Sequence, residues 1–472
     1  MKLIQLPLFI LTVLFVFSCD KKEAVPANVE IQSFVWKGLN AYYLWQEEIE
    51  DLSDRRFTSD QQLFNYLQGY ENPANLFENL LYERGITDKW SWIVDDYIAL
   101  EQAFQGTTET TGMEFGLNSF INDSSKLFGY VRYVVTGTDA ENKGITRGML
   151  FTEVNGTQIT KNNYRNLLFS KENSYTITLA NYNNGSPITN GTTITLNKSQ
   201  YTENPIHKST IFNEGGKKIG YLMYNSFTTD FDDELNNEFA TFKNEGITDL
   251  IIDLRYNGGG SVRTATYLAS MITGQFNNQV FASQRWNKKI MDHLNTSNFT
   301  NNFTDKIDNG IVTQTIHSVG LENIYFITTN SSASASELLI NGLTSYINVK
   351  QVGTKTHGKY VGSVTLYDSP NYTRKDANPN HNWAMQPIVL EIVNKDGTNS
   401  KDGFSPTVEL PENFGNLGIL GDRNEPLLER TISLITTGAK GFSSLNVFDA
   451  PKEFSNSKLH TPTRNNMYVE LK

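Results

Sequence analysis

The chain has 472 residues and a net charge of −11 at neutral pH. Its length exceeds that of one typical domain, so we expect more than one module. The acidic balance argues against nucleic-acid binding, which needs a basic face. The six histidines and one cysteine show no metal-ligand spacing such as H-E-x-x-H, so neither a metal nor another cofactor is expected.

The chain opens with a lysine at position 2 and a short apolar run that ends just before Cys19. Such a run is typical of a secretory signal and is short for a membrane span. Cys19 is the only cysteine, and its setting resembles the lipobox of bacterial lipoproteins. The resemblance implies a signal peptide over residues 1–18, a lipid on Cys19 and a polar tether over residues 19–30. An ordinary signal peptide followed by a free thiol is the alternative.

If Cys19 carries the lipid, the protein is anchored in the bacterial cell envelope and faces the periplasm or the cell surface. No other segment reaches 18 consecutive apolar residues, so membrane contact is expected through the N-terminal lipid alone.

Residues 31–105 have a helical pattern, with aromatic side chains at helical spacing between positions 34 and 45. An aromatic stripe of this kind usually packs in a core or between domains. We therefore expect an N-terminal helical domain.

Residues 106–200 read as short alternating strands joined by Asn, Thr and Gly turns, which predicts a β-rich domain. Residues 112–117 resemble the carboxylate-binding loop of a PDZ domain, and residues 139–156 resemble its helix and following strand. In PDZ domains an extended peptide joins a sheet edge. The peptide-binding loop implied here consists of Gly112, Met113, Phe115, Gly116 and Leu117. The alternative is a small packing domain with no peptide site.

Residues 201–437 alternate predicted strands and helices, as in an α/β core. The predicted strands cover residues 219–223, 250–254, 324–328, 349–352 and 387–393. The predicted helices cover residues 230–244, 262–272 and 336–345. The whole chain is then a multidomain protein, α+β overall with an α/β core. Residues 438–472 are polar and aperiodic, which predicts a loosely packed tail.

A glycine-rich turn, Asn257-Gly258-Gly259-Gly260, follows the predicted strand at 250–254. Glycines let a backbone approach a ligand closely and point N–H groups at an anion. A phosphate loop is the alternative, but neither G-x-x-x-x-G-K-[ST] nor G-x-G-x-x-G is present.

Ser334 lies in a run of small residues between an apolar strand and an amphipathic helix. A serine on such a turn is expected to be exposed at the positive end of the helix dipole, where developing negative charge is stabilised. It is therefore a candidate nucleophile. Ser334 and Glu337 also fit the S-x-x-E pattern of a helix capping box, which by itself needs no catalytic role.

Lys359 lies on a glycine turn one strand later, and a neutral lysine can act as the base for a serine. Its pKa would have to fall from about 10.4 to about 7–8, which requires burial or nearby positive charge. A solvated surface lysine is the alternative. Lys355 is a weaker candidate.

Three motifs in this order, D-L-R-x-N-x-G-G from Asp253, S-A-S-A-S-E over 332–337 and T-x-G-K over 356–359, resemble the carboxy-terminal processing peptidases, or tail-specific proteases. The resemblance implies that Ser334 is the nucleophile and Lys359 the general base. It assigns the oxyanion hole to the backbone of Gly259, Gly260 and Ala335. It assigns the shaping of the site to Arg255 and Glu337. Members of this family carry a PDZ domain ahead of the core.

Two positions depart from the family pattern. The glutamine usually found four residues after the lysine is Ser363 here, and Gln386 is a candidate replacement. The aromatic residue before the glycine is His357, which leaves a Ser334–His357 pair as an alternative dyad.

The function implied is that of a lipid-anchored serine endopeptidase of the envelope. It would cleave proteins or peptides, selected by their C-termini, through an acyl-enzyme. A protease-like scaffold that binds peptides without cleaving them is the alternative, because Ser363 replaces the family glutamine.

Overall fold

The structure is a computed structural model that describes residues 24–293, 295, 299–438, 453–461 and 463–471. The expected signal peptide and Cys19 lie outside these residues, as do residues 439–452. Within the described residues, no helix has the length and apolar character needed to cross a membrane.

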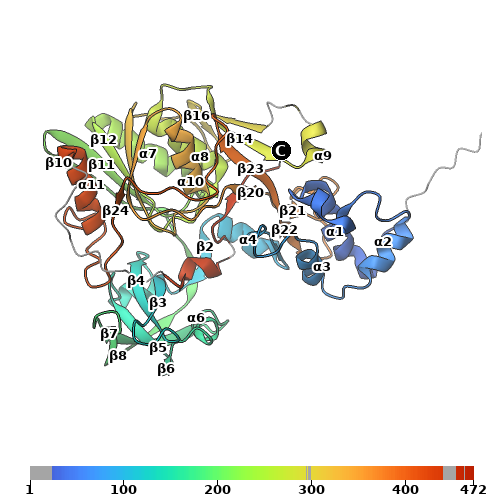
Figure 1. Cartoon of the computed structure of the whole chain (residues 1–472), viewed down its shortest axis with the longest axis horizontal. Coiled ribbons are helices and arrows are strands. Elements are labelled where there is room, and N and C mark those ends of the chain that lie inside the picture. Colours follow the sequence, from blue (N-terminus) through green and yellow to red (C-terminus); the bar gives the residue numbers. More distant parts are fainter. Residues whose placement is uncertain (1–23, 294, 296–298, 439–452, 462, 472) are drawn as a thin grey trace, which may run out of the picture.

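The N-terminal region is mostly helical, as predicted (Figure 1). Its helices are α1 (Glu30–Tyr42), α2 (Asp60–Leu67), α3 (Pro73–Asn79) and α4 (Tyr97–Phe104). Of the aromatic stripe, Phe34 on α1 and Tyr43 just after it are buried in the main core cluster, which confirms a packing role. One strand, β1 (Trp92–Val94), pairs with β22 (Ala384–Gln386), so this region is joined to the core by a sheet that also includes β21 (Leu366–Tyr367).

The β-rich domain forms one sheet of order β25-β3-β4-β5-β7-β8, with β6 beside β5. Strand β25 (Ser455–Asn456) comes from the C-terminal part of the chain. Its own strands are β3 (Met113–Ser119), β4 (Leu127–Val134), β5 (Leu150–Val154), β6 (Thr157–Gln158), β7 (Ser174–Asn181) and β8 (Ile188–Asn197). Its helices are α5 (Asp139–Asn142) and α6 (Tyr164–Leu168). The paired strands β2 (Thr107–Thr110) and β9 (Ser199–Thr202) lie at the two ends of this domain, next to the adjoining regions.

The prediction of a peptide-binding loop over 112–117 was wrong in conformation. Only Gly112 lies in a turn, with φ of +84°, whereas residues 113–117 belong to β3. The reason is that β3 pairs with β4 along its whole length and with β25 on its other side, so these residues form a strand instead of a loop.

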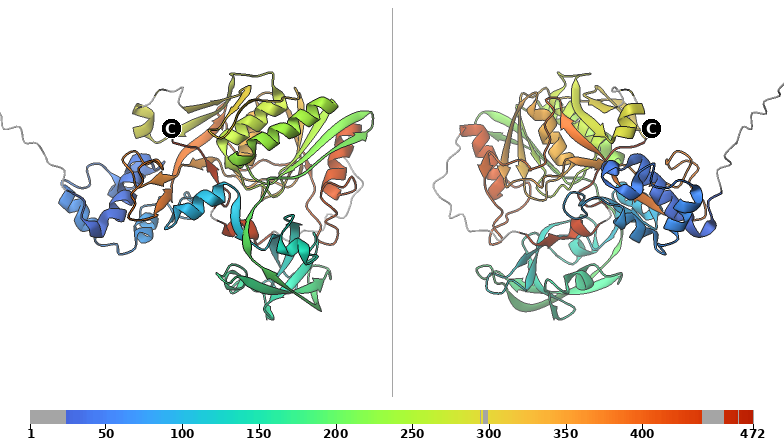
Figure 2. Two further views of the ribbon diagram at one scale, coloured as in Figure 1. Left: turned by 180° about the vertical axis from the view of Figure 1, so that it is seen from behind. Right: turned by 45° about the vertical axis from the view of Figure 1, so that its right-hand side comes forward.

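The core is a six-stranded sheet of order β10-β11-β12-β18-β19-β24, parallel from β11 to β24 (Figures 1 and 2). Its strands are β10 (Ile206–Glu214), β11 (Lys217–Tyr224), β12 (Asp249–Asp253), β18 (Asn323–Thr328), β19 (Asn348–Gly353) and β24 (Val408–Glu409). Successive residues pack on opposite faces, so Ile252 lies in one core cluster and Ile251 in another.

Helices cover both faces of this sheet. Helices α7 (Asp232–Glu245), α8 (Val262–Thr273) and α10 (Ala335–Thr344) pack on the face of Ile252, and α11 (Pro426–Thr437) packs on the other. The strands and helices predicted in the core are confirmed to within two residues at each end. This is the α/β core expected, in a multidomain protein of mixed α and β structure.

A second sheet has the order β13-β26-β20-β23-β14-β15. Its strands are β13 (Gly260–Ser261), β26 (Met467–Tyr468), β20 (Val361–Ser363), β23 (Ile388–Asn394), β14 (Val280–Trp286) and β15 (Thr300–Asn302). Helix α9 (Lys288–His293) and the small hairpin of β16 (Lys306–Asp308) and β17 (Thr313–Thr315) complete this part.

The C-terminal residues 453–461 and 463–471, here called the C-terminal strap, are not the loose tail predicted. They supply β25 (Ser455–Asn456) to the β-rich domain and β26 to the second sheet. Met467 is fully buried in the main core cluster, so a few apolar residues anchor an otherwise polar segment. In Figure 1 the strap is the red segment between the teal domain and the core.

Candidate active site

Ser334 lies between β18 and α10, where it precedes the first residue of the helix. Its φ of +65° and ψ of −115° lie outside the regions that L-residues favour, as is common at functional sites. We expected an exposed serine, but Ser334 is fully buried. Its Oγ has no hydrogen-bond partner among the residues that the structure describes.

Glu337 connects the segments that carry the two candidate catalytic residues. Its Oε2 accepts the N–H groups of Ser334 at 2.9 Å and of Lys359 at 2.8 Å. Its Oε1 accepts the Thr356 hydroxyl at 2.6 Å and the Gly358 N–H at 2.7 Å. Burial raises the pKa of this carboxyl to about 7, although all four bonds favour the ionised form. Glu337 therefore caps the helix and also fixes Lys359 relative to Ser334.

Lys359 is buried, with 2% of its surface exposed, whereas Lys355 is exposed. Burial lowers the pKa of the Lys359 amine to about 7, and the positive charge of Arg464 acts in the same direction. The expected burial is confirmed, and the surface-lysine alternative is excluded.

Two residues of the N-terminal region, Trp90 and Asp88, act on Lys359, and no motif or spacing pointed to them. The amine lies 5.8 Å from the centre of the Trp90 ring. The charge of Asp88 opposes the lowering of the lysine pKa. The N-terminal helical region thus contributes to the surroundings of the candidate base.

The Lys359 amine donates a hydrogen bond to the Asn465 carbonyl oxygen, at 2.6 Å. The alternative base, His357, is exposed, and its Nε2 lies 3.5 Å from the Asn465 amide nitrogen. Neither side chain is hydrogen-bonded to Ser334, whose hydroxyl has no partner within the described chain. Both candidate bases therefore contact the C-terminal strap.

The glycine turn lies against Ser334. At Gly259, where φ is +111°, an added Cβ would lie 2.6 Å from Ser334 Cβ, 2.9 Å from Ala335 N and 2.4 Å from Asn466 O. Only glycine fits at such a close approach. The Gly259 N–H donates to the side-chain oxygen of Asn257 at 2.8 Å, and the Gly260 N–H donates to Asn466 O at 2.6 Å.

These contacts bring the predicted oxyanion-hole residues together beside the candidate nucleophile. The Gly260 N–H donates to a peptide carbonyl, as an oxyanion-hole donor would, whereas the Gly259 N–H donates to the side chain of Asn257. Gly260 is therefore the better candidate donor of the two. A Cβ at Gly260 would lie 2.3 Å from Phe227 O, so this position also requires glycine.

Arg255 does not reach the Lys359 amine. Its guanidinium is fully buried and bonds to Asp253 at 2.7 Å and Glu425 at 2.6 Å. Its carbonyl oxygen accepts the hydroxyl of Thr329, on the loop before Ser334. Arg255 therefore supports the backbone near the site.

Ser363 and Gln386, the two residues considered as replacements for the family glutamine, form hydrogen bonds with groups other than Lys359. Ser363 Oγ donates to the side-chain oxygen of Asn466 at 3.0 Å. Gln386 donates its amide N–H to Thr365, and its buried Oε1 has no partner in the described parts of the chain. Neither residue is hydrogen-bonded to Lys359 in this structure.

A cavity of about 250 Å³ lies beside the glycine turn, between the core, the β-rich domain and the C-terminal strap. Gly259, Ser331 and His357 line its core side, and Arg132 lines it from the β-rich domain. Arg132 donates to Ser331 Oγ at 2.8 Å, so the β-rich domain contacts the loop that carries Ser334. Among the described residues, no group of three or more His, Cys, Asp or Glu side chains is arranged to hold a metal ion.

Two family profiles match this chain. The profile of peptidase family S41 matches residues 218–410, and that of the peptidase S41 N-terminal domain matches residues 30–92. The chain belongs to peptidase family S41. This confirms the family expected from the three motifs.

Curated relatives include a protein named "Probable CtpA-like serine protease" from Staphylococcus epidermidis, which is 25% identical over 193 residues. A similarly named protein of Staphylococcus aureus is 24% identical over 193 residues. The first alignment covers 39% of this S41 chain and 36% of the relative, so the chain spans about a third of the length of the curated relatives that it matches.

Solved structures support the fold over most of the chain. A protein assigned to the S41 proteases of Bacteroides fragilis is 23% identical, with a TM-score of 0.64 over 86% of this chain and 97% of that one. The photosystem II D1 C-terminal processing protease is 15% identical, with a TM-score of 0.52 over 88% of this chain and 99% of that one. At these identities the likeness concerns the fold.

Proposed function

We propose that this S41 protein is a serine endopeptidase that uses Ser334 as nucleophile and Lys359 as general base. The observation that carries the proposal is that Lys359 is buried, has a pKa of about 7 and is held close to Ser334. The backbone N–H groups of Lys359 and Ser334 both donate to the Glu337 carboxylate. A lysine with such a pKa is partly neutral at neutral pH, as a base for a serine must be.

In the proposed reaction Lys359 takes the proton of Ser334 while Oγ attacks the peptide carbonyl carbon. The negative charge that develops on the carbonyl oxygen is stabilised by the N–H groups of Gly260 and Ala335. Lys359 returns the proton to the leaving amine as the C–N bond breaks. Water then hydrolyses the acyl-enzyme, with Lys359 again as the base. Before these steps, the Lys359 amine must turn from Asn465 O towards Ser334.

The substrates proposed are proteins or peptides selected by their C-termini. The support comes from the resemblance of residues 106–200 to a PDZ domain and from β3, whose side opposite β4 pairs with one extended segment, β25. A lipid on Cys19 would confine this activity to the cell envelope.

A peptide-binding scaffold without catalysis is the second candidate. The observation that favours it is that Ser334 Oγ has no hydrogen-bond partner among the described residues while Lys359 bonds to Asn465. A fluorophosphonate probe, which phosphonylates activated serines with loss of fluoride, separates the two candidates. The endopeptidase should be labelled on Ser334 and the Ser334→Ala variant should not. A folded protein that stays unlabelled both as wild type and after residues 463–471 have been displaced from the site would favour the scaffold.

A further inference from the structure

The C-terminal strap contacts both of the regions that a peptide substrate would use. Residues 453–461 lie against the β-rich domain, and residues 463–471 lie at the candidate active site. Figures 1 and 2 show the red segment passing from the teal domain to the core.

At the β-rich domain, the strap adds a strand to the sheet. Strand β25 pairs antiparallel with β3, and the Phe454 N–H donates to Leu117 O at 2.8 Å. Ser457 Oγ accepts the Phe115 N–H at 3.1 Å. The ring of His460 stacks on Phe169, with centroids 3.9 Å apart. This is the manner in which an extended peptide joins an exposed sheet edge.

At the active site, β26 lies between β13 and β20 and is parallel to both. The Asn466 carbonyl oxygen accepts the Gly260 N–H at 2.6 Å. A Cβ added to Gly259 would lie 2.4 Å from this oxygen and 2.6 Å from Ser334 Cβ. The oxygen and Ser334 Cβ are therefore close neighbours. The carbonyl of the Asn466–Met467 peptide bond thus lies beside the nucleophile.

Neighbouring strap atoms engage two more groups of the site. Lys359 donates to Asn465 O at 2.6 Å, and Ser363 donates to the Asn466 side-chain oxygen at 3.0 Å. Met467 is fully buried in the main core cluster. The strap therefore accepts hydrogen bonds from both the Gly260 N–H, a candidate oxyanion-hole donor, and the Lys359 amine, the candidate general base.

We propose that the groove between β13 and β20 is the substrate-binding groove and that the C-terminal strap is an intramolecular inhibitor bound in it. The proposal rests on the proposed function. A substrate and the strap cannot both accept the Gly260 N–H, so they exclude each other. Lys359 is free to reach Ser334 only when Asn465 has left.

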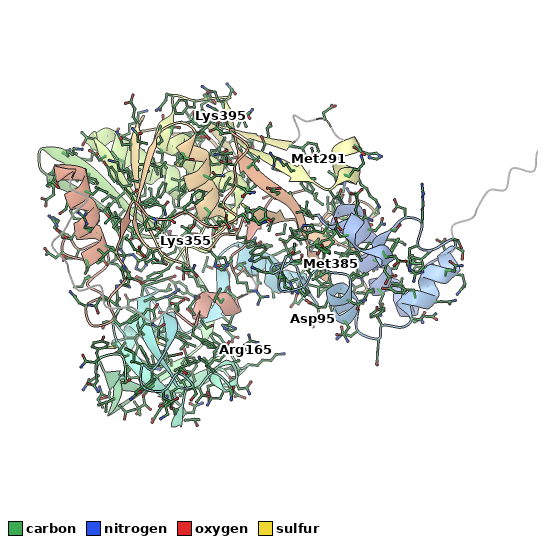
Figure 3. All side chains as sticks on the ribbon, viewed as in Figure 1. Asp95, Arg165, Met291, Lys355, Met385 and Lys395 are labelled. Carbon is green, nitrogen blue, oxygen red and sulfur yellow. The ribbon has the colours of Figure 1, made fainter. Side chains whose placement is uncertain are left out.

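The test uses the full chain with Met467→Asp. An unpaired carboxylate is disfavoured in a buried apolar site, so this change should release residues 463–471 from the groove. If the strap occupies the groove about 99% of the time, release raises the rate of peptide cleavage and of Ser334 labelling by up to about 100-fold. Met291→Asp, on helix α9 (Figure 3), introduces the same charge outside the strap and should leave both rates unchanged.

A milder variant covers the case in which Met467→Asp does not fold. Asn466→Ala removes only the hydrogen bond from Ser363, and it should raise both rates by a few-fold. A synthetic peptide of residues 453–472, added to Met467→Asp, should restore inhibition, whereas a scrambled peptide should not. Fluorescence anisotropy measures the binding of this peptide to Ser334→Ala/Met467→Asp without any need for activity.

The outcomes separate the two proposals. Folded Met467→Asp and Asn466→Ala proteins that are no faster than wild type, or a peptide that does not bind, would overturn the inhibitory strap. Release of a fragment starting at Met467 from wild type, but not from Ser334→Ala, would also overturn it, because the strap would then be a substrate. If the peptide binds but no variant cleaves or is labelled, the strap remains supported and the proposed endopeptidase function fails.

Discussion

The Lys359 amine donates its hydrogen bond to the carbonyl oxygen of Asn465, at 2.6 Å, and not to Ser334. The backbone N–H groups of Lys359 and Ser334 nevertheless both donate to the Glu337 carboxylate. The backbone of the site is thus in position while the amine is engaged by the strap. The arrangement that the proposed reaction needs requires the departure of Asn465 from the Lys359 amine and a turn of that amine towards Ser334.

The lowered lysine pKa predicts the pH dependence of acylation. Only neutral Lys359 accepts a proton, so kcat/KM should rise with pH, with a midpoint near the amine pKa of about 7. Below the midpoint the rate should fall by about tenfold per pH unit if one proton controls it. Stopped assays between pH 5 and 9 measure this profile. A rate that is constant over this range would argue against Lys359 as the base.

Replacement of the buried lysine by methionine should abolish activity and stabilise the fold. The pKa of Lys359 is about 10.4 in an unfolded chain and about 7 when folded, so the folded state binds fewer protons between these values. Stability due to this group therefore increases as pH rises from about 7 to about 10.4. Lys359→Met should increase the free energy of unfolding at pH 7 by about 1–4 kcal/mol. Urea denaturation at pH 7 and 10 checks the gain, which should shrink at the higher pH.

Glu337→Gln should impair both stability and catalysis. The carboxylate accepts four donors, and an amide offers one oxygen, so two N–H or O–H groups would face an NH₂ group. We expect a loss of about 2–3 kcal/mol in stability and a fall of more than about tenfold in kcat. Glu47→Gln, at an exposed glutamate, is the matched control and should change neither. A fully active Glu337→Gln enzyme would contradict the role given to this carboxylate.

The sequence predicted the core and the residues that meet at the candidate active site better than it predicted their surroundings. Continuous short runs of apolar residues were enough to find strands such as β12 and β18, and the motifs singled out Ser334, Lys359 and the glycine turn as candidates. Trp90 and Asp88 could not be found because they come from a distant helical region that reaches Lys359 only in the folded chain.

The C-terminal strap was missed for a different reason. Strands β25 and β26 have two residues each, too few to show a period of two. Their positions depend on pairing with strands more than 100 residues away along the chain. The expected exposure of Ser334 was wrong for the same reason, since Asn466 and the glycine turn cover it.

Substrate selection by the C-terminus predicts a difference between two otherwise identical peptides. A peptide that ends in a free, apolar C-terminal residue should be cleaved faster than its amidated form. Loss of one charge-assisted hydrogen bond would cost about 1.5–3 kcal/mol, or roughly 10–150-fold in affinity. Competition of the two peptides in one reaction, followed by mass spectrometry, measures the ratio. Equal rates would leave the β-rich domain without a role in carboxylate recognition.

Lipidation of Cys19 predicts where the protein is found. The wild-type protein should sediment with membranes, and Cys19→Ala should move to the soluble fraction, because Cys19 would be the attachment point of the lipid. Cell fractionation with immunoblotting tests this. Membrane association that persists in Cys19→Ala would contradict the anchor.

The rate at which the fluorophosphonate probe labels Ser334, compared among single variants of Lys359 and His357, tests the Ser334–Lys359 assignment most directly. Lys359→Ala should reduce labelling to the level of Ser334→Ala, and Lys359→Arg should be equally inactive because arginine stays protonated. His357→Phe should retain labelling, since its ring is not hydrogen-bonded to Ser334. If Lys359→Ala is still labelled while His357→Phe is not, the base is the histidine and the proposed dyad is wrong.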